Sequence, residues 1–281
     1  MDTLLPAEAE RIAVSIGIPP CPTVLTKLVQ EARADEPDLS RIARLVETDV
    51  GLAATVIKLA NGVIYGGTGE LVSIRHALLR IGVQNVIQLV TSLLLKQAFP
   101  AGNAEGMERF WTSSARIAEL SAVIAAGTGA ADRELAYSYG LFRHCGTAAM
   151  LARFPDYERT VMAAAKIGRR LTDVEQVRYG ANHAQIGYLT AQQWLLPAAL
   201  ADAVLHHHGP DAQRGRRSDL KEDSMRLIAV GALAERAQVL DAGDPLPAEM
   251  ESAASLALLQ LGLKEAEIAK IACAGELTLA A

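Results

Sequence analysis

The chain has 281 residues, of which 51% are hydrophobic and only 4% aromatic, and its formal net charge is −5 at pH 7. A chain of this length can bury a core without disulfides or structural metals, and its acidic balance offers no basic field that would draw it onto nucleic acid or anionic lipid. We therefore expect neither nucleic acid nor a membrane among its partners.

Alanine and leucine dominate the sequence, which favours helices over sheets and predicts an all-α fold. The three cysteines, Cys21, Cys145 and Cys273, are far apart and include no Cys-x-x-Cys pair. We expect free, mostly buried thiols rather than a disulfide framework or a thiolate zinc site. The first residues lack the basic region of a signal peptide, and no apolar run approaches the ~20 residues of a membrane span. These features predict a cytoplasmic protein.

The sequence predicts a first lobe, made of short helices, over residues 1–105. Three prolines in Ile18-Pro19-Pro20-Cys21-Pro22 exclude a helix and indicate an extended strap. Beyond it, apolar residues at helical spacing follow the candidate N-caps Asp38 and Ser73. A long apolar helix with few charges is predicted over 83–99, and it must be buried.

The polar, glycine-rich stretch 100–106 predicts a boundary, after which a second lobe covers 106–240. The helices that matter most in it are expected at 132–154, capped by Asp132, at 172–194 after the capping box Thr172-Asp-Val-Glu175, and at 197–208. Residues 241–281 are predicted to form a helical C-terminal extension.

Several short motifs follow one another along the first half of the chain. They are Ile18-Pro19-Pro20-x-Pro22, Asp49-Val50-Gly51-Leu52, Lys58-Leu59-Ala60-Asn61-Gly62-x-x-Tyr65-Gly66, Ile74-Arg75-His76-Ala77 and Leu79-Arg80-Ile81-Gly82. In this order and spacing they resemble the HDOD family, a non-catalytic branch related to the HD phosphohydrolases, over about residues 17–237. The resemblance implies a multi-helical fold with two lobes. It also implies a bacterial signalling protein that works with receiver domains, histidine kinases or cyclic-dinucleotide enzymes, as in two-component systems.

The segment 139–146, Tyr-Gly-Leu-Phe-Arg-His-Cys-Gly, resembles the core motif of the HD superfamily. Members read Gly-Leu-Leu-His-Asp-Ile-Gly-Lys there and use the adjacent His and Asp as metal ligands, whereas this chain has Arg143 and His144. The family's upstream His falls on Ser113, and its downstream Asp falls in 227–234, which contains no carboxylate. The resemblance therefore implies a degenerate metal site, in which the fixed charge of Arg143 opposes cation binding.

Some histidines remain that could serve as ligands, namely His144, His183 and the run His206-His207-His208. Three histidines can bind zinc where their helices converge, but consecutive helical residues point about 100° apart, so the run cannot all face one ion. We interpret His183 and one member of the run as polar remnants of the metal site. His206 and His207 are the members of the run that we place at degenerate metal-site positions. The sequence predicts no metal and no cofactor, with a vestigial metal site without turnover as the alternative.

The favoured hypothesis is a non-catalytic regulatory module that acts through protein contacts. One alternative is a divergent metal-dependent phosphohydrolase that uses the remaining histidines. Another is a sensor in which Arg143, His144 and His183 hold an anionic small molecule through charge-assisted hydrogen bonds. We do not expect Cys145 to act as a nucleophile with His144, because neighbouring side chains on a helix diverge.

Overall fold

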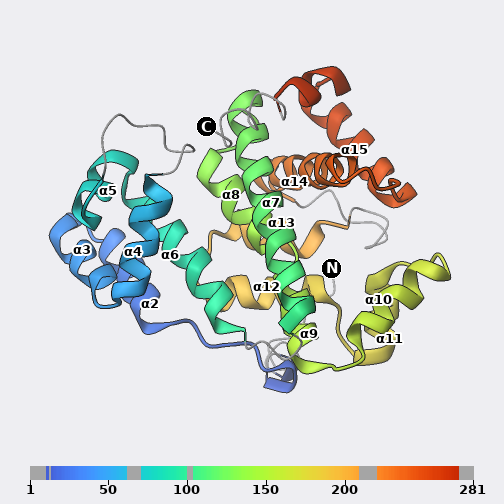
Figure 1. Cartoon of the computed structure of the whole chain (residues 1–281), viewed down its shortest axis with the longest axis horizontal. Coiled ribbons are helices and arrows are strands. Elements are labelled where there is room, and N and C mark those ends of the chain that lie inside the picture. Colours follow the sequence, from blue (N-terminus) through green and yellow to red (C-terminus); the bar gives the residue numbers. More distant parts are fainter. Residues whose placement is uncertain (1–10, 13, 62–70, 100–103, 209–219, 272–281) are drawn as a thin grey trace. The chain divides into compact units, whose positions relative to one another are not determined.

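The computed structural model describes residues 11–12, 14–61, 71–99, 104–208 and 220–271. Every regular element in these ranges is a helix and none is a strand (Figure 1), so the predicted all-α fold is confirmed. None of the described helices combines the length and the apolarity needed to cross a membrane. Cys273 and part of one family motif, from Gly62 to Gly66, lie outside the described residues.

The described residues between Pro20 and Ala98 belong to the smaller of two compact units. Its helices are α2 (Thr23–Ala32), α3 (Leu39–Glu47), α4 (Val50–Ala60), α5 (Ile74–Ile81) and α6 (Val83–Ala98). Asp38 caps α3 by accepting hydrogen bonds from two backbone N–H groups, and Ser73 caps α5 by accepting one from the N–H of His76. The predicted caps are confirmed. One face of α6 is buried, as its apolar sequence requires.

The larger unit holds the described residues up to Pro19 and from Phe99 to 271. Its helices are α7 (Ala104–Thr128), α8 (Arg133–Phe142), α9 (Cys145–Arg153), α10 (Tyr157–Lys166), α11 (Leu171–Tyr179), α12 (His183–Gln193), α13 (Ala198–His206), α14 (Glu222–Asp241) and α15 (Ala248–Leu261). Helices α7 and α8 pack along each other, α14 contacts α7, α8 and α15, and α12 packs against both α9 and α13 (Figure 1). The Trp194 indole, buried in this unit, donates a hydrogen bond of 3.0 Å to the Pro19 carbonyl. The proline strap is thereby held to the helices that carry the histidines.

The predicted helix over 132–154 is wrong, because the chain leaves helical geometry in the middle of the HD-like motif. Asp132 does cap α8 as expected, accepting a hydrogen bond of 2.8 Å from the N–H of Leu135. Helix α8 ends at Phe142, however, and α9 starts at Cys145, with His144 as its N-cap at φ −114° and ψ 20°. Arg143 and His144 therefore lie at a corner between two helices.

The single helix predicted over 172–194 is also wrong. Gly180, at φ 78°, ends α11 in the left-handed conformation that glycine adopts easily. Asn182 then caps α12 in a reciprocal capping box with Gln185. The predicted box at 172–175 is not formed, because α11 has already begun at Leu171. The predicted helix over 197–208 ends early, since α13 stops at His206.

Candidate functional site

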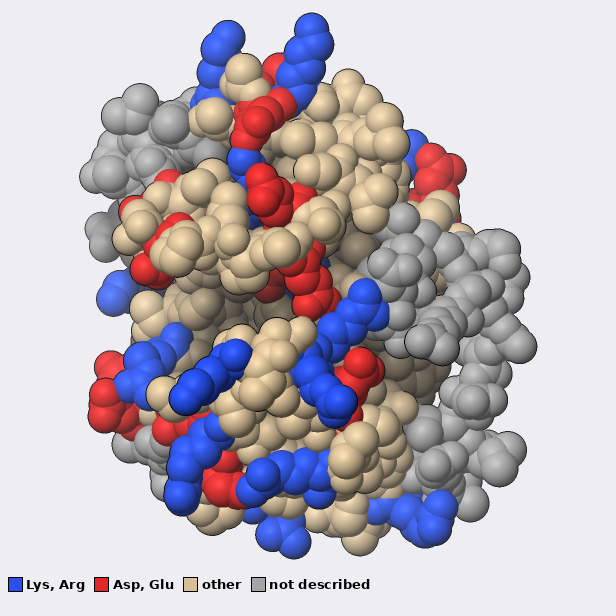
Figure 2. Space-filling view, turned by 90° about the vertical axis from the view of Figure 1, so that its right-hand side faces the viewer, with Lys and Arg blue, Asp and Glu red and all other residues tan. Residues whose placement is uncertain are grey.

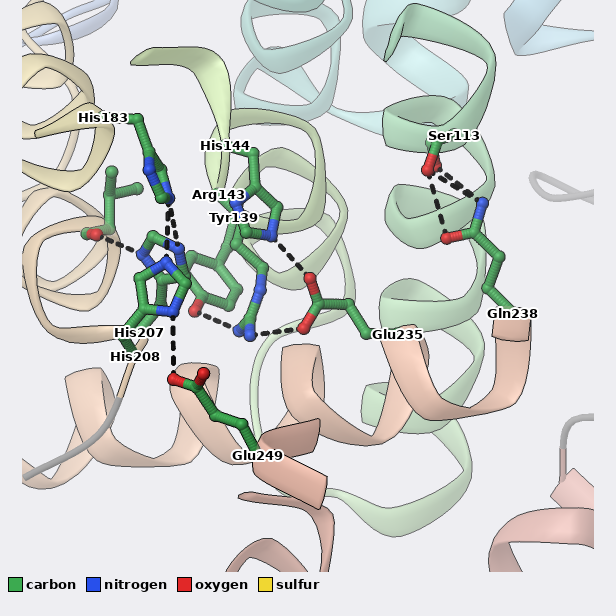
Figure 3. Close-up of polar contacts among 11 residues, drawn as sticks. Ser113, Tyr139, Arg143, His144, His183, His207, His208, Glu235, Gln238 and Glu249 are labelled. Atoms are coloured by element: carbon green, nitrogen blue, oxygen red, sulfur yellow. Dashed lines mark hydrogen bonds and ion pairs between the residues drawn. The ribbon is translucent and has the colours of Figure 1, made fainter. Parts of the chain in front are cut away.

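Four imidazole rings converge in the larger unit and form what we call the histidine cluster: His144, His183, His207 and His208. One ring nitrogen from each lies within 4.8 Å of those of the other three (Figure 3). Each ring is carried at a helix end: His144 caps α9, His183 is the first residue of α12, and the other two follow the end of α13. The ends of α8, α11 and α13, which the sequence did not predict, therefore bring the rings together.

The run of three histidines does not face a single point, but two of its members do. His207 and His208 both belong to the histidine cluster, whereas His206 does not. The argument from the 100° helical step assumed a helix through residue 208. His207 keeps near-helical dihedrals, φ −67° and ψ −21°, but α13 ends at His206 and the His207 and His208 rings both turn toward His183. We expected His206 and His207 at the degenerate site. The structure places His207 and His208 there instead.

The outer nitrogens of the histidine cluster meet oxygen acceptors. His183 Nδ1 lies 2.8 and 3.0 Å from the two carboxylate oxygens of Glu175, which also accept a hydrogen bond from the His183 backbone N–H and one from the Tyr157 hydroxyl. His207 Nδ1 lies 2.6 Å from the carbonyl oxygen of Val204. These partners fix the ring orientations and leave the Nε2 atoms of His183 and His207 facing each other at 3.4 Å.

Arg143 and His144, the two residues at the HD positions, share one carboxylate. Arg143 is only 3% exposed, and its Nη2 donates to Glu235 Oε2 at 2.6 Å while its Nη1 donates to the Tyr139 hydroxyl at 2.9 Å. His144 Nε2 lies 2.5 Å from the other oxygen of Glu235. Gly231, one turn before Glu235 on α14, makes this approach possible, because a Cβ there would come within 2.6 Å of the Tyr139 ring and 2.9 Å of Arg143 Nη1.

The Arg143–Glu235 pair is charged. Burial alone would raise the pKa of Glu235, but Arg143 and His144 outweigh it and hold that pKa well below its ordinary value. Burial would likewise lower the pKa of Arg143, yet the adjacent Glu235 and Tyr139 raise it. The buried Tyr139 hydroxyl has its pKa raised to about 12. The guanidinium is therefore neutralised by a partner on another helix, as a buried charge requires.

Three rings of the histidine cluster, those of His144, His207 and His208, favour the neutral form. Burial, helped by the nearby cations, lowers the pKa of His144 and His207, and it lowers that of His208 to about 4. Glu175 behaves in the opposite way, because the hydrogen bonds and charge of His183 overcome the effect of burial and lower its pKa. A buried carboxylate therefore stands behind the His183 ring. Histidine ligates metals through a ring nitrogen in its neutral form.

Ser113, the position of the family's upstream ligand, lies apart from the histidine cluster (Figure 3). Its hydroxyl accepts a hydrogen bond of 3.0 Å from the side-chain amide of Gln238. Residues 227–234 carry no carboxylate, but Glu235 follows them directly and reaches the corner that they do not. Sequence reasoning also missed Glu175, which it assigned to a capping box. For Glu235, the available signal was a single acid next to a fully apolar stretch.

The arrangement limits what the site can do. Both terminal nitrogens of Arg143 already donate to Glu235 and Tyr139, and only its buried Nε has no hydrogen-bond partner among the described residues. An anion held through the terminal nitrogens would therefore have to displace a buried carboxylate. Neutral imidazoles suit ions such as zinc, copper and nickel, whereas magnesium, calcium and manganese prefer oxygen ligands. The site is thus better matched to a transition-metal ion than to an anionic ligand.

The all-α fold and the histidine-lined corner define a helical domain of the HD-like class. The chain belongs to the HDOD family, whose HDOD domain matches residues 18–210. A protein from Treponema pallidum (strain Nichols), named only as uncharacterized, is 27% identical over 212 residues, which cover 72% of this chain. The chain spans only 40% of the length of that curated relative.

Solved structures show the same fold. A candidate phosphohydrolase from Shewanella amazonensis SB2B has a TM-score of 0.70 at 21% identity, and an HDOD domain protein of unknown function from Geobacter sulfurreducens has 0.63 at 19%; each match covers 96% of both chains. A candidate signal transduction protein from Marinobacter aquaeolei VT8 has 0.68 at 20%, over 96% of this chain and 60% of its own. At these identities the similarities establish the fold alone.

Proposed function

We propose that this chain is a non-catalytic, cytoplasmic regulatory module of bacterial signal transduction, which acts through contacts with other proteins. The observation that carries the proposal is the Arg143–Glu235 ion pair. At the position where the HD motif has its first metal ligand stands a buried guanidinium, 2.6 Å from a carboxylate on α14. A cation cannot be held by that side chain, and the carboxylate is already committed to it.

Hydrolysis of a phosphate ester by a bound metal needs a coordination position that is open to water, and two-metal sites clamp both the attacking and the leaving oxygen. The candidate ligand set found among the described residues consists of four imidazoles without a carboxylate. Four protein nitrogens around one ion would fill a tetrahedral site and leave no place for water. The donor set therefore favours a module that does not turn over a substrate.

The names of related structures fit this view without establishing it. The Marinobacter protein, of which the match covers 60%, is named as a signal transduction protein. The Treponema relative is also much longer than the matched segment. Segments of this kind embedded in longer chains suit a domain that works beside others, for which we propose receiver domains, histidine kinases or cyclic-dinucleotide enzymes as partners.

A second candidate function is metal-dependent phosphohydrolysis, which the convergence of four histidines favours. Incubation of untagged protein with Mn²⁺, Mg²⁺ or Zn²⁺ and with a phosphomonoester, nucleotides or a cyclic dinucleotide separates the two functions. We expect no release of phosphate or of linear dinucleotide above that of a His183→Ala variant. Turnover that His183→Ala abolishes, and that the exposed-histidine variant His76→Ala retains, would replace the regulatory proposal by the catalytic one.

The helical pair α10–α11 offers a surface suited to protein contact. Met162, Ile167 and Val177 are 68%, 62% and 88% exposed there. Three bases on α10 or shortly after it, Arg159, Lys166 and Arg169, are exposed as well. Figure 2 views the side of the molecule on which these helices lie, and basic side chains gather over its lower part. Exposed apolar residues on a helical pair that also carries exposed bases suit a partner that presents an acidic face.

This surface can be tested by substitution without touching the histidine cluster. We expect a Met162→Asp, Val177→Asp variant to lose retention of an acidic partner from cell extract that the wild-type chain retains. Leu79→Asp is the matched control, because Leu79 is also apolar and 63% exposed but lies on α5 of the smaller unit. Equal retention by both variants would remove α10–α11 from the proposal.

A further inference from the structure

The Nε2 atoms of His183, His207 and His208 meet without enough protons to pair them. The Glu175 carboxylate and the Val204 carbonyl accept hydrogen bonds, so His183 and His207 carry their protons on Nδ1. Their Nε2 atoms then present lone pairs to each other at 3.4 Å. His208 adds a third Nε2, 2.8 Å from that of His183. A proton on His208 Nε2 could bridge to one of these lone pairs and would leave the other without a partner.

The spacing of these nitrogens fits a metal ion. Zn²⁺ binds histidine nitrogen at about 2.0–2.1 Å with tetrahedral geometry, which places the ligand atoms about 3.3 Å apart. The Nε2 atom of His183 lies 3.4 Å from that of His207 and 2.8 Å from that of His208. His144 supplies a fourth nitrogen within the 4.8 Å limit of the cluster. Small shifts of the rings would bring all four to bonding distance.

A second and independent observation is the charge behind the cluster. The Glu175 side chain is fully buried, with 0% exposure, and its hydrogen-bond partners are a tyrosine hydroxyl and the backbone and ring of His183. These groups satisfy its oxygens, but an ionised carboxylate is costly to bury without a positive charge beside it, and His183 supplies one only when its ring is protonated. A cation on the far nitrogen of His183 would supply the missing charge. Carboxylate, histidine and metal in line is a common arrangement around zinc.

We propose that the histidine cluster binds one divalent transition-metal ion, with zinc the best match, in a closed four-nitrogen site. Because the site joins the ends of α9, α12 and α13, the bound ion cross-links three helices of the larger unit. The Arg143–Glu235 pair stays intact beside it, with Glu235 accepting from His144 as Glu175 does from His183. The ion thus holds structure together and activates no water.

The test uses full-length protein without an affinity tag, freed of metal by a chelator and then titrated with Zn²⁺ alone. We expect one ion per chain, measured by calorimetry with a competing chelator and by mass spectrometry of the dialysed protein. Co²⁺ in its place should give the visible absorption of a tetrahedral nitrogen site. The melting temperature should rise with zinc, because an ion that binds only the folded state stabilises it. A wild-type chain that takes up no stoichiometric zinc overturns the proposal.

Variants locate the ion. His208→Ala and His144→Ala remove half-buried ligands, each 24% exposed in its side chain, and each should weaken zinc binding by at least about 100-fold. Glu175→Gln should weaken it by about 10–100-fold, as expected for the residue that orients a ligand. His206→Ala and His76→Ala, outside the cluster, should bind as the wild type does. Circular dichroism verifies folding. If either His208→Ala or His144→Ala does not fold, the other variant still tests the site.

The outcome separates this inference from the proposed function. Zinc bound by the cluster without turnover supports both, and zinc bound with turnover keeps the site but ends the regulatory proposal. Zinc affinity that is unchanged in both His208→Ala and His144→Ala means that the ion binds elsewhere, and it overturns the inference alone.

Discussion

The two units of the molecule bury different kinds of side chain. In the smaller unit, the buried polar residues among those described are Thr91 and Ser92, and each hydroxyl donates to the carbonyl one turn earlier on its own helix. The larger unit buries Arg143, Glu175 and His183, whose partners lie on other helices. The smaller unit needs only apolar packing, whereas the larger one depends on polar contacts between helices.

This difference is informative because buried ion pairs seldom stabilise a protein more than apolar residues of the same size would. A core that served only stability would resemble that of the smaller unit. Retention of a guanidinium, a carboxylate and several imidazoles in one corner is better explained by binding. Substitutions placed in each unit test this difference between the two cores.

The largest effect is expected at Glu235. Glu235→Ala leaves Arg143 buried and unpaired, which should lower the free energy of unfolding by about 3–5 kcal/mol in urea titrations. Thr91→Val, which removes a buried hydroxyl from the smaller unit, should cost no more than about 1.5 kcal/mol, since its hydrogen bond is local. Similar losses in the two variants would mean that the two cores do not differ as described.

A double variant sharpens this prediction. Arg143→Leu combined with Glu235→Leu removes both charges together, and it should recover most of the stability that Glu235→Ala loses. The same double variant should leave zinc binding by His183, His207 and His208 measurable. If the double variant is as unstable as the single one, the loss comes from packing around Gly231 rather than from the unpaired guanidinium.

Much of the fold could be predicted from sequence because the signals for a helix come from residues that are close together in the chain. The apolar spacing and the caps at Asp38, Ser73 and Asp132 depend on neighbouring residues, and all three caps are present. The helix breaks at 143–144 and after 206 could not be predicted in this way. No glycine or proline occupies 143–144, and Gly209-Pro210 signals an end to α13 but places it later than His206. Long-range partners such as Glu235 and His183 explain the geometry there.

The candidate site was partly visible for the same reason. Arg143 and His144 were found through a motif that occupies consecutive positions, and His183 was named as one of the remaining histidines. The structure brings His144 and His183 into one cluster. Glu175 and Glu235 were missed, because their roles depend on contacts 8 and 91 residues away along the chain. His208 was set aside by a helical argument that fails one residue earlier. Pairing between distant helices is what a single sequence does not reveal.

Alkaline pH should affect the larger unit next. Burial raises the pKa of Tyr139 to about 12, above the value of about 10 in an unfolded chain. The native state then holds this proton more tightly, so stability is complete below pH 10 and falls as pH rises toward 12, by up to about 2.7 kcal/mol.

Urea titrations at several alkaline pH values give the slope, and Tyr139→Phe should make it shallower. All tyrosines among the described residues belong to the larger unit. Hydrogen exchange should therefore show that α8 loses protection before α3 does. The same slope in wild type and Tyr139→Phe would assign the alkaline loss to other groups.

Effects of opposite sign are expected from two glycines, one in each unit. A Cβ at Gly146 on α9 would overlap the backbone carbonyl of His183, so Gly146→Ala should cost about 1–3 kcal/mol and push α12 away. At Gly51 on α4 the nearest atom would lie at 3.4 Å, and Gly51→Ala should instead gain about 0.5–1 kcal/mol. Thermal and urea unfolding measure both changes.

Zinc titration of the same two variants connects packing to the site. Because Gly146 sets the distance between α9, which His144 caps, and α12, which starts with His183, the folded Gly146→Ala protein should bind zinc more weakly than wild type. Gly51→Ala should leave zinc affinity unchanged. Loss of stability at Gly146 with undiminished zinc affinity would mean that the cluster tolerates helix displacement, and that its ligands are positioned by their oxygen partners rather than by the packing of α9 on α12.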